Sequence, residues 1–337
     1  MRYLVQSRDL ISIIIPIYNG EKYIKHIYSN IMSQTYRPIE LIMVNDGSTD
    51  HSGNLLDDIM KGHNCNTLVH IKVLHKENSG IAGARNIGLS EAMGKYVMFM
   101  DQDDWMEDDC VRTLADIAFV RNADIVIGGF NKVNDKKEIE ETWNLNPQFS
   151  WSKFRITAPW GRLYKKAIID KKKITFFDTK ISEDLCFNIL FLSYADSVEV
   201  IHYAGYNWWQ NHNSESHSNW SKMSEDRNPL KVLTELHMRI GDSDLLKEDE
   251  MAFFFTKYLV WYLLFCSRGA TYIQVKKRSE ELFLWLKGNY PHFSQYVWKG
   301  IMFPKGENIK IRLCVAGVLL MWKLRVLSLF LEVYRRL

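Results

Sequence analysis

Cysteine is scarce and scattered in this chain of 337 residues, which has only five: Cys65, Cys110, Cys186, Cys266 and Cys314. No two of them form a CxxC pair, and an odd number cannot all pair within one chain. The pattern argues against a disulfide framework and against a zinc site built from cysteine pairs. We therefore expect free thiols in a reducing compartment.

A strong excess of one charge is also missing, because 43 Lys and Arg stand against 40 Asp and Glu, a formal net charge of +3. Proteins that bind duplex nucleic acid usually carry a clear basic excess. We therefore expect no nucleic-acid partner. The composition, with 47% hydrophobic and 25% charged residues, is that of a globular protein with a sizeable core.

Long hydrophobic runs are absent as well. No segment reaches the roughly 18 uncharged apolar residues that a membrane span requires, and the nearest candidate, 313–322, is bounded by Arg312 and Lys323. The apolar run 11–15 ends at Pro16 and is too short for the core of a signal peptide. These absences predict a cytoplasmic protein that reaches a membrane only peripherally.

The segment that could make such a membrane contact is 309–337, which has an apolar body with several charges. On a helical wheel most of these charges fall on one side: Lys310, Arg325, Glu332, Arg335 and Arg336. Two further cations, Arg312 and Lys323, fall on the opposite side. A basic amphipathic helix would lie in a membrane interface. A helix of this kind equally fits packing against the rest of the protein, and the pattern leaves both interpretations open.

The first 130 residues or so alternate short apolar runs of β type with helical patterns, which is typical of an α/β fold with a mostly parallel sheet. The predicted strands are 11–15, 40–45, 69–74, 96–100 and 124–128. The predicted helices are 23–32, 82–93 and 107–120. No GxGxxG or GxxxxGKS/T pattern follows the first strand, which argues against a dinucleotide site and against a P-loop.

Beyond this region the pattern changes. Residues 132–147 are charged and polar and predict a surface connection, and 151–218 is mixed and rich in Trp and Tyr. From about residue 229 onward the pattern predicts helices. Among them 251–266 is apolar on nearly all faces and is expected to be buried.

Polar, turn-forming clusters follow four of the predicted strands: 18–20, 46–50, 78–80 and 101–104. Ligands of open α/β sheets bind in the crevice at the carboxyl ends of the strands. We therefore expect the four loops to build a single site.

Asp101 and Asp103 form the sharpest of these patterns. Two carboxylates at i and i+2 after a strand can reach a hard cation and a diphosphate, and Mg²⁺ typically binds through one or two carboxylates plus substrate phosphates. The alternative is an acidic turn before the next helix, but the position beside the other loops favours the metal site. For Asp46, a hydrogen bond to a nucleotide base and a plain strand-to-helix turn fit equally well.

A second acidic pair, Glu183–Asp184, precedes the apolar helical pattern 185–194. A carboxylate there could act as a general base that takes a proton from an acceptor hydroxyl. Taken alone, such a pair more often marks the acidic start of a surface helix.

Aromatic and histidine side chains supply further candidates. Trp160, Trp208 and Trp209 could stack on sugar rings, although large aromatic residues more often pack in a core. His212 and His217 lie in a polar segment and could complete a metal shell, although such histidines are more often solvated.

Read together, these segments resemble the inverting glycosyltransferases of family two, which have the two-lobed GT-A fold. The matching segments occur in the family's order: ISIIIPIYN (11–19), QTY (34–36), ELIMVNDGSTD (40–50), NSGIAGARNIG (78–88) and GKYVMFMDQDDW (94–105). In the second half APWGRLY (158–164), EDLCF (183–187) and YNWWQ (206–210) resemble later motifs. Arg162 stands there for the usual Lys, and Gln210 stands where the family commonly has an Arg that contacts phosphate or acceptor.

The resemblance implies a role for each matching position. The nucleotide-sugar donor would be bound by Pro16, Tyr18, Asn19, Asp46, Asn78, Arg85 and Asp101. Of these, Arg85 would lie near the diphosphate, and Asp101 with Asp103 would face a Mg²⁺ or Mn²⁺ ion. Asp184 would be the catalytic base. The candidates for acceptor contacts are Trp160, Arg162 and Glu183.

The resulting hypothesis is an inverting glycosyltransferase that moves a sugar from a UDP-linked donor to a glycan or lipid-linked acceptor in surface polysaccharide synthesis. Residues 1–220 would form the GT-A domain, with a donor half 1–130 and an acceptor half 131–220, and 221–337 a helical region that could associate with the membrane. The alternatives are a sugar-phosphate nucleotidyltransferase, whose basic glycine-rich loop is missing here, and a non-catalytic nucleotide-sugar-binding or structural protein.

Overall fold

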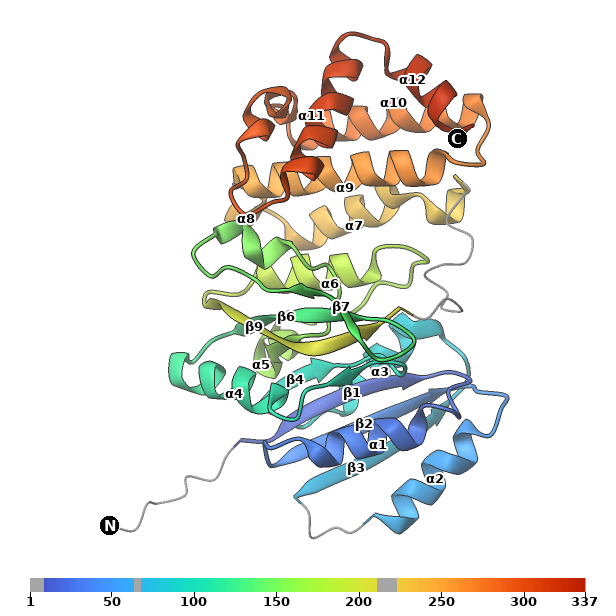
Figure 1. Cartoon of the computed structure of the whole chain (residues 1–337), viewed down its shortest axis with the longest axis vertical. Helices are drawn as coiled ribbons and strands as arrows, with labels where there is room; N and C mark the ends of the chain where they lie inside the picture. Colours follow the sequence, from blue (N-terminus) through green and yellow to red (C-terminus); the bar gives the residue numbers. More distant parts are fainter. Residues whose placement is uncertain (1–8, 64–67, 211–222, 337) are drawn as a thin grey trace. The chain divides into compact units, whose positions relative to one another are not determined.

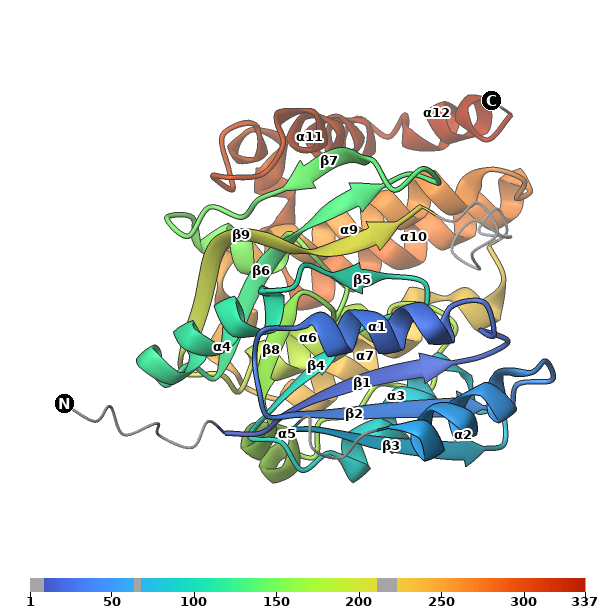
Figure 2. The same cartoon turned by 60° about the horizontal axis from the view of Figure 1, so that its bottom comes forward.

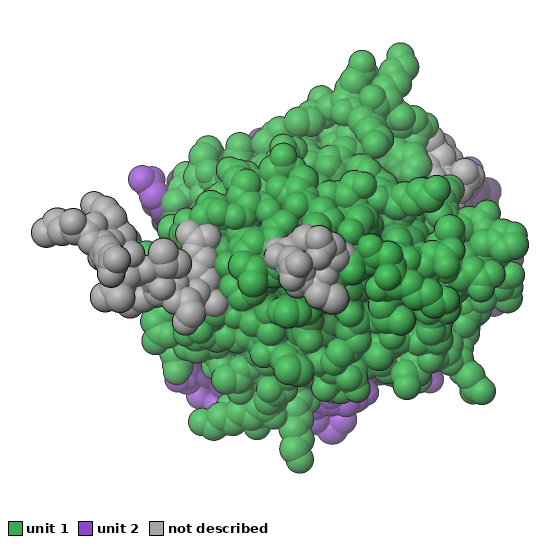
Figure 3. Space-filling view, turned by 90° about the horizontal axis from the view of Figure 1, so that it is seen from below, with its two compact units in different colours: residues 1–147, 157–178, 183–211 green, residues 148–156, 179–182, 212–337 purple. Residues whose placement is uncertain are grey.

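The computed structural model describes residues 9–63, 68–210 and 223–336, which belong to two compact units, coloured separately in Figure 3. Unit 1 comprises 1–147, 157–178 and 183–211. Unit 2 comprises 148–156, 179–182 and 212–337. Two short segments from the middle of the chain therefore join the second unit.

Unit 1 is built on one sheet with the strand order β3–β2–β1–β4–β8–β6–β9–β5, in which β7 also pairs with β6 (Figures 1 and 2). The strands are β1 Ile11–Ile17, β2 Ile39–Asp46, β3 Val69–Lys76, β4 Tyr96–Phe99, β5 Trp105–Met106, β6 Ile125–Val133, β7 Ile139–Trp143, β8 Arg162–Lys165 and β9 Val198–Trp209. Strands β1 to β4 are parallel, and so are β6 and β9. β5, β7 and β8 run antiparallel to their partners.

The first strands read as continuous apolar runs because they are covered on both faces. Every residue of β1 and β2 is buried, as is usual for the strands of parallel sheets. The register pairs Ile17 with Asn45 and Asp46 with Lys76, so these strands end at a common edge. The polar segments that follow them consequently meet there, as the sequence predicts.

Six helices complete the described part of unit 1: α1 Ile24–Ser33, α2 Ser52–Gly62, α3 Gly80–Glu91, α4 Cys110–Arg121, α5 Lys166–Lys172 and α6 Glu183–Leu192. Helix α3 packs on β1 and β2. It approaches β1 closely at Gly88, where an added Cβ would lie 2.4 Å from Cγ2 of Ile14. The α/β architecture expected from the sequence is confirmed.

The prediction of a plain surface connection over 132–147 is wrong. Residues 139–143 form β7, which pairs with β6 through contacts such as Phe130 opposite Trp143. The side chains of β7 are nearly all exposed, so its composition is that of a loop although its backbone belongs to the sheet.

Unit 2 is helical within its described residues: α7 Pro229–Ile240, α8 Asp244–Lys247, α9 Asp249–Ser267, α10 Tyr272–Asn289, α11 Ile309–Lys323 and α12 Leu327–Tyr334, with short 3-10 turns η2 Ser150–Phe154, η4 Glu225–Arg227, η5 Phe293–Val297 and η6 Lys299–Ile301. Figure 1 shows α9 and α10 side by side, and both pack against the last helices. The predicted helical C-terminal region is confirmed. None of the helices described has the length and apolar character needed to cross a bilayer.

Two expectations for this region need correction. Helix α9 is not buried all round, because Trp261 and Phe265 are 44% and 41% exposed. The segment 309–337 is not one helix, because α11 ends at Lys323 and Arg325 adopts a φ of +60° before α12 begins. A single helical wheel over the whole segment therefore misplaces the charges of α12.

Candidate functional site

The loop after β1 is tied to the loop after β2 through Asn19. The Asn19 backbone N–H donates to Ser48 Oγ at 3.0 Å, and the Asn19 side-chain oxygen accepts from the Thr49 N–H at 2.8 Å. Asn19 has a φ of +46°, a left-handed conformation that asparagine tolerates better than most residues. Its amide thus holds two of the predicted donor-binding loops together.

Asp46 ties the loop after β2 to the loop after β3. This buried side chain accepts hydrogen bonds from the Ser79 N–H at 2.7 Å and from Ser79 Oγ at 3.1 Å. The Asn78 amide donates to the Asp46 carbonyl at 3.0 Å. Gly47 allows this approach, since its φ is +68° and an added Cβ would lie 2.7 Å from the Asn78 nitrogen.

The loop after β4 is tied to the loop after β1 by Gln102, the middle residue of the Asp101–Asp103 segment. The Tyr18 N–H donates to Gln102 Oε1 at 3.0 Å, and Gln102 Nε2 donates to the Tyr18 carbonyl at 3.1 Å. The Tyr18 ring is left 46% exposed, whereas Pro16 is buried within β1. The four predicted loops therefore do form one connected rim.

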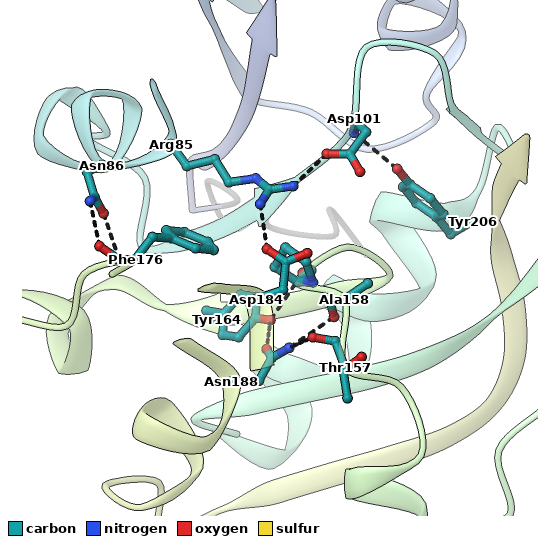
Figure 4. A network of polar contacts seen from close by, with 11 residues as sticks. Arg85, Asn86, Asp101, Thr157, Ala158, Tyr164, Phe176, Asp184, Asn188 and Tyr206 are labelled. Carbon is teal, nitrogen blue, oxygen red and sulfur yellow. Dashed lines mark hydrogen bonds and ion pairs between the residues drawn. The ribbon is translucent and has the colours of Figure 1, made fainter. Parts of the chain in front are cut away.

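A buried arginine links this rim to helix α6 (Figure 4). Arg85, on α3, is 1% exposed and donates from Nη1 to Asp184 Oδ1 at 2.5 Å and from Nη2 to Asp101 Oδ1 at 2.7 Å. Its guanidinium also lies over the ring of Phe176, 5.2 Å from the ring centroid. Residues from α3, the end of β4 and the start of α6 thus meet around one cation.

The charges of this group alter one another's protonation. Burial disfavours the Arg85 charge, but Asp184, Asp101 and Glu183 outweigh burial and raise the pKa of Arg85. Burial, together with Glu183 and Asp101, raises the pKa of Asp184 to about 7 against the opposing effect of Arg85. Burial also raises the pKa of Glu183. Asp184 is therefore a carboxylate poised to exchange a proton near neutral pH.

Hydrogen bonds from residues of β9 hold the turn that carries Asp101 and Asp103. The Tyr206 hydroxyl donates to Asp104 Oδ2 at 2.6 Å and accepts from the Asp101 N–H at 3.1 Å. The Trp209 N–H donates to Asp104 Oδ1 at 2.9 Å. Burial, with Asp101 and Asp103 nearby, raises the pKa of Asp104 well above its ordinary value. The pair Asp104–Tyr206 cannot be predicted from the sequence, since nothing in the pattern 101–104 distinguishes a buried carboxylate from an exposed one.

Replacing Tyr206 by Phe should remove this anchor while keeping the ring. We expect a loss of about 1–3 kcal/mol in the free energy of unfolding, because the buried Asp104 carboxyl and the Asp101 N–H lose a partner. Urea denaturation measures the loss. Tyr203→Phe is the matched control on the same strand, since the Tyr203 hydroxyl donates to the exposed Asp109. Equal losses in the two variants would contradict the anchoring role of Tyr206.

The predicted acceptor residues differ in exposure. The Trp160 ring stacks on Tyr206 with centroids 4.5 Å apart and planes at 2°, and Trp160 and Arg162 are only 7% and 1% exposed. Burial argues against direct sugar contacts for these two, whereas Glu183 is half-buried at the start of α6. Trp208 and Trp209 are half-buried on β9. His212 and His217 lie outside the described residues.

Helix α6 is held to the segment before β8 by a second polar network (Figure 4). The Tyr164 hydroxyl donates to Asn188 Oδ1 at 2.5 Å, and the Asn188 amide donates to the carbonyls of Thr157 at 2.6 Å and Ala158 at 3.1 Å. The Asn86 amide exchanges two hydrogen bonds of 2.8 Å with the Phe176 backbone. These contacts fix the start of α6, and therefore Asp184, relative to α3.

The carboxylates after β4 fit a metal ion whose coordination is completed by the phosphates of its substrate. Within the described residues no group of three or more His, Cys, Asp and Glu is arranged to hold an ion. Asp101 and Asp103 are both half-buried, and Asp101 Oδ1 is engaged by Arg85. Ions such as Mg²⁺ and Mn²⁺ typically bind through one or two carboxylates and the phosphates of a substrate. Two carboxylates at a partly open turn agree with this mode of binding.

Solved structures resemble the chain along most of its length. The structure of S. aureus TarS 1–349 in complex with UDP-GlcNAc matches with a TM-score of 0.68 at 18% identity, over 97% of this chain and 91% of that one. The mannosyltransferase PcManGT of Pyrobaculum calidifontis, solved with GDP-Man and Mn²⁺, matches with a TM-score of 0.50 at 13% identity, over 98% and 86%. At such identities the likeness shows the fold alone, and it confirms the predicted GT-A architecture.

Sequence comparisons agree. Glycosyltransferase GlyA of Streptococcus pneumoniae serotype 4 is 34% identical over 196 residues, which cover 52% of this chain and 27% of that protein. Across three curated relatives the chain spans 27%, 39% and 62% of their lengths. Residues 12–185, more than half of the chain, match the family model described as glycosyl transferase family 2. The chain therefore belongs to glycosyl transferase family 2.

Proposed function

We propose that the protein transfers a sugar from a UDP-linked donor to a hydroxyl group of a glycan or lipid-linked acceptor, with inversion at the anomeric carbon. The observation that carries the proposal is the placement of Asp184, with a pKa raised to about 7, beside the carboxylates that follow β4. Residues 1–220 would perform the transfer, and 221–337 would be an accessory region.

In this mechanism Asp184 takes the proton of the acceptor hydroxyl. The acceptor oxygen forms a bond to the anomeric carbon as the bond from that carbon to the diphosphate oxygen breaks. The nucleoside diphosphate leaves with the electron pair of the broken bond. Glu183, adjacent to the base, would contact the acceptor.

Arg85 acts in this proposal as a positioning residue. Both of its Nη atoms are occupied by Asp101 and Asp184, which makes direct binding of the diphosphate the weaker role for it in this conformation. A buried cation between two carboxylates fixes their separation and keeps Asp184 from moving away from the donor loops. The diphosphate would then lie near Arg85 without displacing its partners.

The donor would lie along the rim of loops. The exposed Tyr18 ring offers a face for a base, and Pro16, Asn19, Asp46 and Asn78 shape the surroundings. Asp101 and Asp103 would hold Mg²⁺ or Mn²⁺, which when bound neutralises the charge that develops on the leaving diphosphate. The choice of UDP is supported by TarS, which was solved with UDP-GlcNAc.

We place the reaction in surface polysaccharide synthesis at the inner face of the cell membrane. This placement follows from the proposed lipid-linked acceptor, which would be held at a membrane, and from the bacterial sources of the relatives.

A panel of nucleotide-sugars titrated against the purified protein, with and without Mn²⁺, tests the proposal. We expect saturable binding of one UDP-sugar that a chelator abolishes, followed by release of UDP when acceptor is added. Binding without turnover on any acceptor would favour the non-catalytic alternative. Preference for an NTP together with a sugar phosphate would favour the nucleotidyltransferase alternative.

The protonation of Asp184 predicts the pH dependence. Since the base works only when deprotonated and its pKa is raised to about 7, kcat/KM should fall about tenfold per pH unit below pH 7 and level off above it. Glu183 contributes to raising that pKa, so Glu183→Gln should move the midpoint to lower pH. A midpoint that does not move in this variant would argue against Asp184 as the titrating base.

A further inference from the structure

Three consecutive elements of unit 2 leave apolar side chains exposed, and we call their exposed side the C-terminal surface. It consists of η6 with its flanking residues, α11 and α12. The apolar members are Trp298, Ile301, Met302, Ile309, Leu313, Leu320, Leu324, Val326, Leu329 and Val333. Trp298 and Met302 are 70% and 80% exposed. Apolar side chains exposed on three successive elements are more typical of an interaction site than single surface leucines are.

Helix α11 has two apolar sides, only one of which packs against the described residues of unit 2. Val315, Val318 and Leu319 are buried, and Trp322 stacks on Phe283 with centroids 5.0 Å apart. Packing within unit 2 therefore explains the apolar residues on this side of α11 and not those on the other side. The other side exposes an apolar stripe at helical spacing: Ile309, Leu313, Leu320 and Leu324.

Cations border the stripe on both sides. On a helix with 3.6 residues per turn, Lys310 falls on one flank and Arg312 and Lys323 fall on the other. From such flanks, long side chains can reach upward to charged headgroups while the stripe enters an apolar layer. Arg312 and Lys323, which the predicted wheel places opposite its main charged side, thus border the apolar stripe on its second side.

The charge of this part of the chain has one sign. Residues 298–336 carry eight Lys and Arg against two Glu, a formal charge of +6, so the remaining residues sum to −3 because the whole chain carries +3. Both glutamates are neutralised locally. Glu307 is buried and accepts from Lys257 at 2.8 Å, and Glu332 is bound by Arg335 and Arg336.

Four cations of the C-terminal surface are exposed and make no ion pair with any other described residue: Lys305, Lys310, Lys323 and Arg325. The apolar stripe and the cations around it together suit a partner that has an apolar interior and a negatively charged outer layer. A second copy of the chain on this face would set cations against cations around a two-fold axis. Lysine is also depleted in protein interfaces.

We propose that the C-terminal surface docks on a lipid bilayer whose headgroups are anionic, with the stripe of α11 and the exposed side of α12 inserted at the interface. Docking concerns a different unit from the proposed transfer site and can be measured without donor or acceptor. A failed vesicle experiment and a failed turnover assay are therefore distinguishable.

Flotation of the full chain with vesicles tests the proposal. We expect strong binding to vesicles of phosphatidylcholine with phosphatidylglycerol, weak binding to phosphatidylcholine alone, and a loss of binding at high salt. Lys310→Gln with Lys323→Gln should weaken the partition coefficient about fivefold per charge. Leu313→Ser with Leu324→Ser should weaken it at least about tenfold, because two exposed leucines no longer enter the apolar layer.

The matched control is Val120→Ser with Met238→Ser, two exposed apolar residues on α4 and α7 that should leave vesicle binding unchanged. All these sites are exposed, so the variants should keep the unfolding transition of the wild type. Three results would overturn the proposal: equal binding to neutral and anionic vesicles, equal effects of the leucine and control variants, or a lipid-free dimer that Leu313→Ser with Leu324→Ser dissociates.

Discussion

Asp184→Asn should stop sugar transfer and leave donor binding intact. The substitution keeps the size of the side chain and an oxygen that can accept from Arg85 Nη1, but it removes the group that takes the acceptor proton. A positioned general base contributes about 10² to 10⁴ in rate, so kcat should fall by about 10³-fold. Release of UDP in the presence of acceptor measures kcat, and titration of the donor measures binding.

Glu183→Gln is the matched control, because it removes a carboxylate from the adjacent position of the same helix turn. We expect it to keep most of kcat above pH 7, where the rate levels off, because the glutamine side chain can still hydrogen-bond to the acceptor. If Asp184→Asn turned over at the wild-type rate, Asp184 would not be the base. If kcat fell as much in Glu183→Gln as in Asp184→Asn, the two carboxylates would share the role of general base.

Asp103→Ala should abolish the effect of Mn²⁺ on donor binding. Asp103 is half-buried in the same turn as Asp101 and offers a second carboxylate to the ion. Stabilisation of a diphosphate by a divalent ion is worth several kcal/mol, which corresponds to a loss in donor affinity of about 100-fold or more. Titration of the donor with and without Mn²⁺ measures the difference.

Asp116→Ala, which removes an exposed carboxylate of α4, is the control for the loss of one negative charge. It should leave the Mn²⁺ effect unchanged. If Mn²⁺ still raised the donor affinity of Asp103→Ala as it does in the wild type, Asp103 would not be a metal ligand. An equal loss in Asp116→Ala would mean that net charge, and not a metal ligand, controls donor binding.

The parts of the fold that can be predicted are those whose pattern is local. The apolar runs of β1, β2 and β4 identify buried parallel strands, and the turn residues after them identify the edge at which a ligand binds. The motif Glu183–Asp184 is identified as a site only through its resemblance to a family, since the pattern alone more often marks the start of a surface helix.

The parts that cannot be predicted depend on contacts between distant residues. Asp104 meets Tyr206 across 102 positions, and Arg85 meets Asp184 across 99. No local sequence pattern predicts either of these two contacts. β7 is missed for a different reason, since an edge strand with exposed side chains has the composition of a loop. The end of α11 is missed because Arg325, and not Gly or Pro, adopts the left-handed conformation.

The pairing of β5 with β9 sets an order of events during synthesis on the ribosome. Strands β1 to β4 can pair as soon as the first hundred or so residues have emerged, because their partners are close in sequence. The turn 101–104 waits longer, since β5 pairs with β9 at Asn207 and the Tyr206 hydroxyl secures Asp104. A nascent chain would thus possess a nearly complete donor half before its acidic turn is fixed. The substrate-binding edge is consequently completed late in translation, when β9 leaves the exit tunnel.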